Sequence, residues 1–308
     1  MTNRDFHDPR ATEQRNPRSE RIDVASSLEI VDIMNAEDAR VAGVVQGQRE
    51  QIARAIDLIV GAFKAGGRLL YVGAGTSGRL GVLDATECPP TFGVPPTMVT
   101  GVIAGGYPAL VKSAEGAEDD VNAGMVAMDT AQVTNRDVVV GIAASGTTPY
   151  VRAALGKAQT LGATTVLLTC AMPPKVLAET CDVIINPVVG PEVLTGSTRL
   201  KAGTATKLVL NTLSSGAMIR LGKAFGNLMV DLMALSAKLH DRGERIVMEV
   251  GGVSREEARQ AIERATGSVK LAIVMVRRKV DAAEARRLLE TADGFVRPVV
   301  GDPPPVGR

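Results

Sequence analysis

Short apolar runs alternate with stretches of helical periodicity along the middle of the chain. The apolar runs predict strands, and they lie at 68–72, 98–103, 137–142, 164–169 and 182–186. A long amphipathic helix is predicted before them over 44–65, and further helices are predicted between them over 78–85, 107–130 and 149–161. Strands rich in Val and Ile that alternate with helices are typical of a parallel sheet covered on both faces. The predicted fold class is therefore α/β, with a doubly wound parallel sheet flanked by helices.

The pattern becomes helical after residue 200, which predicts a different organisation for the C-terminal part. Helices are predicted over 202–221, 225–249, 254–264, 268–277 and 281–291, and the last three are short. We therefore expect three parts in the chain. They are an N-terminal arm with a short helix over 1–45, a sheet domain over 46–245, and a small helical region with a tail over 246–308.

Composition narrows the class of protein. The 308 residues include 35 basic and 34 acidic side chains, and this near neutrality argues against nucleic-acid binding or attachment to a membrane surface. Neither a secretory signal nor an apolar run of membrane-spanning length is visible. The three cysteines fit a reduced, cytoplasmic protein better than a disulfide scaffold. The two histidines form no cluster with metal-ligand spacing, so we expect no metal site.

The N-terminal segment is polar and is predicted to be irregular. It contains five arginines interleaved with acids, namely Arg4, Arg10, Arg15, Arg18 and Arg21. This mixture is interpreted as a solvated arm.

Two loops rich in glycine and hydroxyl side chains carry the strongest functional signal. The first, Gly-Ala-Gly-Thr-Ser-Gly over 73–78, follows the predicted strand 68–72 and contains Thr76 and Ser77. The second follows strand 137–142 and contains Ser145, Gly146, Thr147 and Thr148, with Pro149 well placed to begin a helix.

Both hydroxyl loops are predicted to lie at the carboxyl ends of strands, where parallel sheets bind ligands. Glycine allows close approach of the backbone, and amides at a helix start bind anions. The two loops together predict one pocket for a phosphorylated small molecule. A helix start capped without any ligand remains an alternative for the second loop. The Gly-x-Gly-x-x-Gly match over 73–78 is weak evidence for a dinucleotide, because no acid ends the next strand.

Candidate catalytic groups are carboxylates. Glu87 lies between an apolar helix and a Cys-Pro-Pro turn, where partial desolvation would raise its pKa and suit it to donate a proton. Glu118 belongs to an acidic cluster after the glycine turn at 105–106. Either could instead be an ordinary solvated carboxylate. A third polar loop contributes Glu192, Ser197 and Lys201 as candidate substrate contacts. The alternative is capping of the long helix for Ser197 and an ordinary surface position for Lys201.

Long ordered blocks of the chain resemble the N-acetylmuramic acid 6-phosphate etherase family. The blocks are Gly-Ala-Gly-Thr-Ser-Gly-Arg-Leu-Gly-Val-Leu-Asp-Ala over 73–85 with Glu-Cys-Pro-Pro-Thr over 87–91, Ile-Ala-Gly-Gly over 103–106, Glu118 with Asp119, and the segments 143–150 and 190–201. The similarity extends over nearly the whole chain. It implies a sugar isomerase (SIS) fold for residues 46–245, with a five-stranded parallel sheet, Ser/Thr loops that bind a phosphosugar, and a homodimer.

The resemblance also implies an activity. Members of the family convert N-acetylmuramic acid 6-phosphate and water to N-acetylglucosamine 6-phosphate and D-lactate, without a metal or organic cofactor. Glu87 matches the catalytic proton donor, and Glu118 matches the second catalytic acid. The residues leave open which glutamate removes the C2 proton. A non-catalytic sugar-phosphate sensor of the glucokinase-regulator type and an aldose–ketose phosphosugar isomerase remain alternatives.

Overall fold

The computed structural model describes residues 10–232 and 237–306. The chain divides into two compact units. The first comprises the residues up to Ala85 together with Thr97–Ser214, and the second comprises Thr86–Pro96 together with the chain from Ser215 onward. No helix in the described ranges is both long enough and apolar enough to cross a bilayer.

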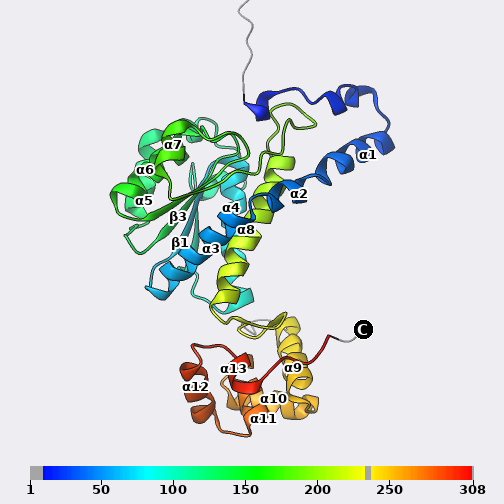
Figure 1. Cartoon of the computed structure of the whole chain (residues 1–308), viewed down its shortest axis with the longest axis vertical. Coiled ribbons are helices and arrows are strands. Elements are labelled where there is room, and N and C mark those ends of the chain that lie inside the picture. Colours follow the sequence, from blue (N-terminus) through cyan, green and yellow to red (C-terminus); the bar gives the residue numbers. More distant parts are fainter. Residues whose placement is uncertain (1–9, 233–236, 307–308) are drawn as a thin grey trace, which may run out of the picture. The chain divides into compact units, whose positions relative to one another are not determined.

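The first unit is built on a five-stranded parallel sheet in the order β2-β1-β3-β4-β5 (Figure 1). All five predicted strands are confirmed, as β1 (Leu69–Gly73), β2 (Val99–Ile103), β3 (Val138–Ile142), β4 (Thr164–Leu168) and β5 (Val183–Ile185). Leu69 of β1 pairs with Val99 on one side and with Val138 on the other. The chain therefore builds outward from β1 to β2 and then crosses back to β3, so the strand order reverses between β1 and β3.

Helices cover both faces of the sheet, as the pattern predicted. On one face lie α5 (Val121–Thr130), α6 (Pro149–Thr160) and α7 (Lys175–Thr180), which pack on alternate residues of β1 and β3 (Figure 1). The opposite face is covered by α3 (Arg49–Lys64) and α4 (Gly75–Phe92).

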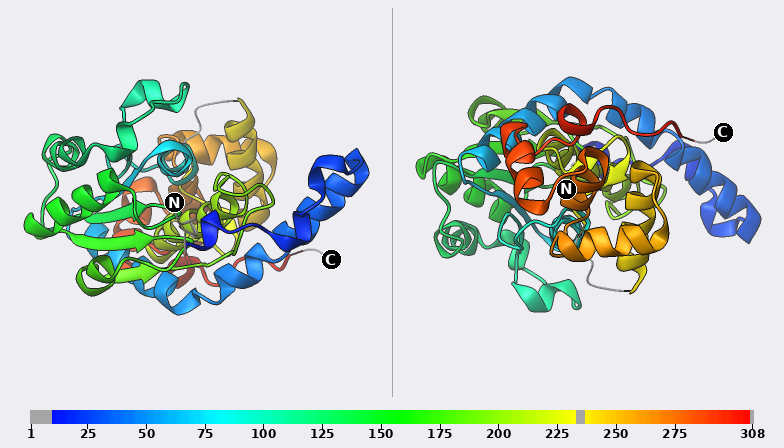
Figure 2. Two further views of the ribbon diagram at one scale, coloured as in Figure 1. Left: turned by 90° about the horizontal axis from the view of Figure 1, so that it is seen from above. Right: turned by 90° about the horizontal axis from the view of Figure 1, so that it is seen from below.

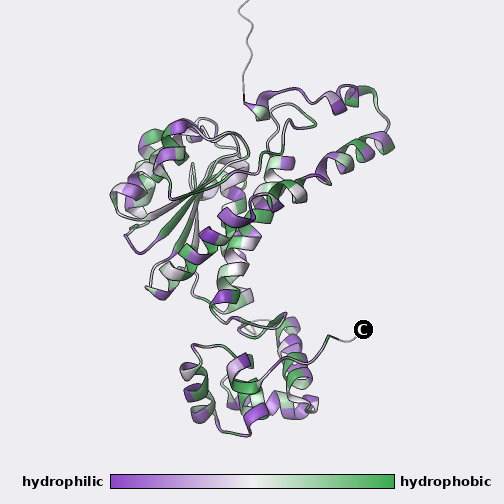
Figure 3. Cartoon of the chain, viewed as in Figure 1, coloured by the Kyte–Doolittle hydropathy of each residue, from purple (hydrophilic) through white to green (hydrophobic). Residues whose placement is uncertain are grey.

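The strands are the most continuously hydrophobic segments of this unit (Figure 3). They are buried on both sides, and β1 and β3 are buried along their whole length. This double burial explains their near-continuous apolar sequence. Burial of both faces also removes the alternation of polar residues that an exposed sheet would show.

Parts of the predicted helices 107–130 and 225–249 form other structure, and glycines with positive φ lie at both places. Residues 107–130 form two single 3₁₀ turns, Tyr107–Leu110 and Ala117–Asp119, before α5. Gly106 and Gly116 lie there with φ of 70° and 76°, a conformation that ends helices. At the start of the predicted helix 225–249, the short strands β6 (Ala224–Phe225) and β7 (Leu228–Met229) form a hairpin instead.

The second unit contains the predicted C-terminal helices, and three of them, α10 (Arg255–Arg264), α11 (Val269–Arg278) and α12 (Ala282–Thr291), begin at a capping side chain. The side chains of Ser254, Ser268 and Asp281 accept hydrogen bonds from the backbone three residues further on. The helices of this unit, coloured from yellow to red in Figure 2, enclose an apolar core of their own. They also include α9 (Ala237–Gly251) and α13 (Arg297–Val300).

From Arg10 onward the N-terminal arm forms turns and helices rather than an irregular segment, which corrects the sequence-based expectation for these residues. It forms 3₁₀ turns at Ala11–Glu13, Pro17–Ser19 and Ile22–Val24, then α1 (Ser27–Asp38) and α2 (Val41–Gln46). The side chains of Thr12, Asn16 and Ser19 are buried. Polar side chains of this kind are buried only where partners satisfy them.

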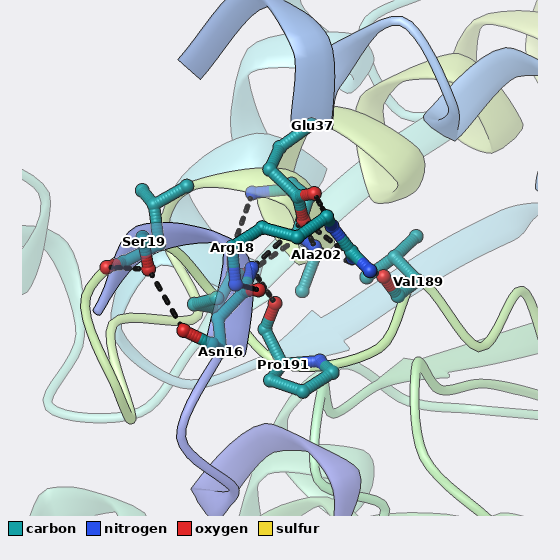
Figure 4. Close-up of polar contacts among 10 residues, drawn as sticks. Asn16, Arg18, Ser19, Glu37, Val189, Pro191 and Ala202 are labelled. Atoms are coloured by element: carbon teal, nitrogen blue, oxygen red, sulfur yellow. Dashed lines mark hydrogen bonds and ion pairs between the residues drawn. The ribbon is translucent and has the colours of Figure 1, made fainter. Parts of the chain in front are cut away.

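Buried Glu37, at the end of α1, is the centre of the contacts that hold this arm (Figure 4). Lys201 at the start of α8 (Lys201–Arg220) places its Nζ 2.5 Å from Glu37 Oε2 and 3.2 Å from the carbonyl of Val189. Asn16 donates to Glu37 Oε2 at 2.8 Å, and the guanidinium of Arg18 donates to both carboxylate oxygens. The carboxylate therefore joins the arm, α1 and α8.

A second buried carboxylate, Glu192, caps α8. It accepts from the backbone N–H groups of Lys201 at 3.0 Å and Ala202 at 2.9 Å. Burial raises the pKa of Glu192, and the two N–H donors oppose that rise. Beside it, Ser19 donates to the carbonyl of Val193 at 2.8 Å, so the arm is also fixed to the loop that precedes α8.

Glu37 predicts a measurable pH dependence of stability. Hydrogen bonds from Arg18 lower its pKa from 4.5 to about 2 against the effect of burial, with further help from Lys201 and Asn16. A lowered pKa gives stability that is fully present above pH 4.5 and is lost as the pH falls toward 2. Glu37→Gln, which leaves a buried ammonium unpaired, is expected to lower the free energy of unfolding at pH 7 by about 3 kcal/mol. That difference from the wild type should shrink below pH 4.5.

Tyrosine fluorescence offers a suitable measurement in urea titrations at several pH values. The chain has no Trp, and its three tyrosines, Tyr71, Tyr107 and Tyr150, all lie in the first unit. Asp38→Asn, which neutralises the exposed neighbour of Glu37, is the matched control and should change stability by less than about 0.5 kcal/mol. A Glu37→Gln effect as small as this control, or one independent of pH, would contradict the assigned role.

Candidate functional site

The carboxyl ends of β1 and β3 place the two hydroxyl loops side by side. The strands are neighbours in register, with Gly73 opposite Ile142, and each is followed by one of the loops. The strand order reverses between these two strands, and in open parallel sheets such a reversal opens a crevice for ligands. The helices α4 and α6 begin at this crevice, so the positive ends of both helix dipoles face it.

Glycine is required at two positions in these loops. A Cβ at Gly78 would lie 2.6 Å from the side chain of Ile103 and 2.7 Å from the carbonyl of Gly73, so the first turn closes only without one. Gly146 has φ of +71°, which lets the second loop reverse direction and present the hydroxyls on either side of it. Both glycines therefore shape the crevice through the backbone.

A cavity of about 350 Å³ occupies this crevice. Its hydroxyls form a connected set, since the oxygens of Ser145 and Thr147 lie 2.9 Å apart and the Thr147 N–H donates to Ser145 Oγ at 3.3 Å. The structure thus brings together six of the predicted site residues at one cavity. They are Thr76, Ser77, Glu118, Ser145, Thr147 and Thr148.

Arg10 of the N-terminal arm also lines this cavity, and sequence analysis did not predict it. Its Nη1 donates to Thr147 Oγ1 at 3.4 Å, and the neighbouring Thr12 carbonyl accepts from the N–H of Gly196 at 3.1 Å. The interpretation of the arm as solvated is therefore wrong for Arg10, whereas Arg4 lies outside the described residues. Nothing in the spacing of the five arginines singles out the one that reaches the hydroxyl loop.

Acids line the cavity as well. Glu13, Glu118 and Asp119 all contribute to its walls, and Glu118 also lines an adjoining cavity of about 270 Å³. The two cavities share Ala74 and Gly75 in addition to Glu118. A ligand that fills both would therefore pass this carboxylate.

Four predicted contacts do not line the 350 Å³ cavity. Gly146 acts through its backbone, and Ser197 lies beside Thr198, which does line the cavity. Glu192 and Lys201 are 1% and 2% exposed and are engaged in capping α8 and pairing with Glu37. Their polar atoms therefore stabilise the protein around the cavity. The burial of Lys201 also rules out the alternative of an ordinary surface lysine.

Glu87 lies in the later part of α4, within the second unit. It is an exposed residue, more than three turns after the first residue of that helix. The expected turn at Cys-Pro-Pro is absent, because α4 continues through Pro89 and Pro90. The side chain of Glu87 is exposed in this single chain, so the burial expected from the sequence is not found there.

Part of the sheet domain is similar to a known domain family, and nearly the whole chain is similar to known proteins. Residues 51–159 match the family model of the glucokinase regulatory protein N-terminal SIS domain. The solved structure of phosphoheptose isomerase GmhA from Neisseria gonorrhoeae is 20% identical, with a TM-score of 0.47, and the match covers 62% of this chain and 99% of that one.

Relatives in sequence are much closer. An N-acetylmuramic acid 6-phosphate etherase of Edwardsiella ictaluri is 52% identical over 295 residues, which is 96% of this chain and 98% of that protein. One from Mesorhizobium japonicum is 52% identical over 292 residues, or 95% of each chain. Identity of this level over nearly the full length of both proteins shows that the chain belongs to the N-acetylmuramic acid 6-phosphate etherase family.

Proposed function

We propose that this protein cleaves the D-lactyl ether of N-acetylmuramic acid 6-phosphate, giving N-acetylglucosamine 6-phosphate and D-lactate. The observation that carries the proposal is the full-length similarity to proteins named for this activity. The crevice supports it independently, because its hydroxyls, its arginine and two helix N-termini suit a sugar phosphate. We expect a cytoplasmic homodimer, and exposed Leu28 and Val31 on α1 offer apolar surface for a second subunit.

The 6-phosphate would bind at the second hydroxyl loop. Ser145, Thr147 and Thr148 supply donors there, Thr76 and Ser77 face the same cavity, and Arg10 supplies the positive charge. Charge-assisted hydrogen bonds of this kind are roughly twice as strong as neutral ones. Anchoring the phosphate would hold the sugar carbons at a fixed distance from Glu118.

The reaction proceeds by elimination and addition. Opening of the sugar ring exposes the C1 aldehyde, which acidifies the proton on C2. Glu118 removes this proton, the electron pair forms the C2–C3 double bond, and the C3–oxygen bond breaks as Glu87 protonates the departing lactate. Water then adds its oxygen to C3 and a proton to C2, and the ring closes. The route needs two carboxyl groups in opposite protonation states and no cofactor, and each group contributes about 10²–10⁴-fold.

A second candidate function is a non-catalytic sugar-phosphate sensor. The match of residues 51–159 to a domain of glucokinase regulatory protein is the observation that favours it. Release of D-lactate from N-acetylmuramic acid 6-phosphate by the purified protein would exclude a sensor. Binding of the sugar phosphate without lactate release would exclude the etherase.

Substitution of the two glutamates should separate their roles. Glu118→Gln is expected to abolish both C2 proton exchange with deuterated water and lactate release, whereas Glu87→Gln should abolish lactate release and retain exchange at C2. Each loss should be at least about 10²-fold. Proton exchange by NMR and an enzymatic lactate assay measure the two steps, and Glu50→Gln, an exposed residue of α3, is the control. The opposite pattern would exchange the two roles.

Solvent oxygen tests the route itself. In water labelled with ¹⁸O, elimination followed by addition places one labelled oxygen at C3 of N-acetylglucosamine 6-phosphate. The aldehyde oxygen at C1 also exchanges with labelled water, so the product is first returned to unlabelled water to remove that label. Mass spectrometry then measures the label at C3. A product that retains the original bridging oxygen would refute the elimination.

Arg10→Gln should weaken binding of the phosphate. We expect an increase in KM of about tenfold with little change in kcat, because a hydrogen bond to a charged group contributes roughly 1.5–3 kcal/mol. Inhibition by inorganic phosphate should weaken in parallel. Arg15→Gln is the matched control, since Arg15 is an exposed arginine of the same arm that does not line the cavity. Equal effects of the two substitutions would show that Arg10 acts only through the general charge of the arm.

A further inference from the structure

The adjoining cavity of about 270 Å³ has walls of an unusual composition. Five alanines line it, and its one cationic side chain is Arg79. The alanines are Ala74, Ala104, Ala109, Ala114 and Ala117. The cavity thus combines a wall of small apolar side chains with polar groups, of which Arg79 is the single positive one.

Arg79 is held in place by the loop it faces. Its Nε donates to the carbonyl of Leu110 at 3.1 Å, and the residue is half-buried. Two carboxylates, Glu115 and Glu118, also line the cavity, and within the described parts of the chain neither forms an ion pair with Arg79. The Nη1 and Nη2 groups are therefore left for a ligand, and a guanidinium presents them in the fork that matches a carboxylate.

The close approach of the turn at Gly105 leaves room only for small side chains in this wall of the cavity. Gly105 has φ of +81°, and a Cβ there would lie 2.8 Å from the Cβ of Ala114 and 3.3 Å from that of Ala109. The turn therefore packs directly on two of the alanines. Larger side chains at these positions would fill the space beside Arg79.

We propose that this cavity is the subsite for the D-lactyl group, with Arg79 binding its carboxylate and the alanines contacting its methyl group. The inference rests on the proposed function. It follows from the order of groups along the substrate, because the phosphate would occupy the cavity at Ser145 and the C2 proton would lie at Glu118. Glu118 lines both cavities, so the ether on C3, the carbon next to C2, extends into the Arg79 side.

Arg79 is then a determinant of substrate specificity. Aldose and ketose phosphates lack the lactyl carboxylate, so they would leave a half-buried guanidinium without its anionic partner. A site that provides a charged partner for one substrate group discriminates against analogues that lack this group. Arg79 would also hold the leaving group while its C3–oxygen bond breaks.

The test compares two substrates that differ only in charge at the lactyl group. These are N-acetylmuramic acid 6-phosphate and its neutral lactyl amide. The wild-type protein should prefer the acid by about 10- to 100-fold in kcat/KM, as expected for a bidentate charged contact. Arg79→Met should lower kcat/KM for the acid by that factor and bring the ratio of acid to amide close to one. Arg79→Lys should retain part of the preference.

Inhibition by N-acetylglucosamine 6-phosphate, which lacks the lactyl group, reports whether the variants are folded and bind the phosphate. It should change by less than about twofold in Arg79→Met if the contact is confined to the lactyl group. Lys112→Met is the matched control, because Lys112 is an exposed cation of the same loop that does not line the cavity. It should keep the wild-type ratio.

Distinct outcomes separate this inference from the function on which it rests. Lactate release by the wild type with an unchanged acid-to-amide ratio in Arg79→Met would overturn the subsite alone. Equal loss of N-acetylglucosamine 6-phosphate binding in that variant would overturn it too, and would assign Arg79 to the phosphate or to the fold. Absence of lactate release by the wild type would overturn the proposed function together with this subsite.

Discussion

The reversal of strand order between β1 and β3 is the constraint on which the site depends. Because the connections leave these two neighbouring strands in opposite directions, no helix crosses over their shared carboxyl end. Two loops and two helix N-termini converge in the resulting crevice. Donor groups for an anion are therefore concentrated there by topology, before any individual side chain is considered. Serine and threonine then add hydroxyl donors to a site that the backbone has already made favourable for negative charge.

The buried carboxylate of Glu37 extends this site beyond the sheet. By pairing with Lys201 at the start of α8 and with Arg18 of the arm, it holds the N-terminal segment against the third loop. The arm in turn delivers Arg10 to the hydroxyl loop. A buried ion pair has a large desolvation cost, so its contribution to stability is modest unless a partner is removed. Here the ion pair mainly fixes the position of the N-terminal segment, which has little apolar surface of its own to bury.

The sequence predicted the sheet well because hydrophobic burial on both faces leaves a strong local signal. All five strands and both hydroxyl loops were expected where they lie. Interactions between distant segments were not predictable in this way. Lys201 and Glu192 looked like substrate contacts, because a polar loop before a helix is equally suited to bind a ligand or to pair with a distant acid such as Glu37. Arg10 was missed because its position depends on those same distant contacts.

Two adjoining cavities that share one carboxylate suggest how the substrate is aligned. An anchor at one end of a flexible sugar leaves rotation about that anchor free, and a second anchor at the other end removes it. Glu118 lines both the cavity at the hydroxyl loop with Arg10 and the cavity with Arg79, and under the proposed function these two anchors would fix the C2–C3 bond beside this carboxylate. Binding energy from groups remote from the reacting carbons would then be used for orientation, which is where such energy accelerates a reaction most effectively.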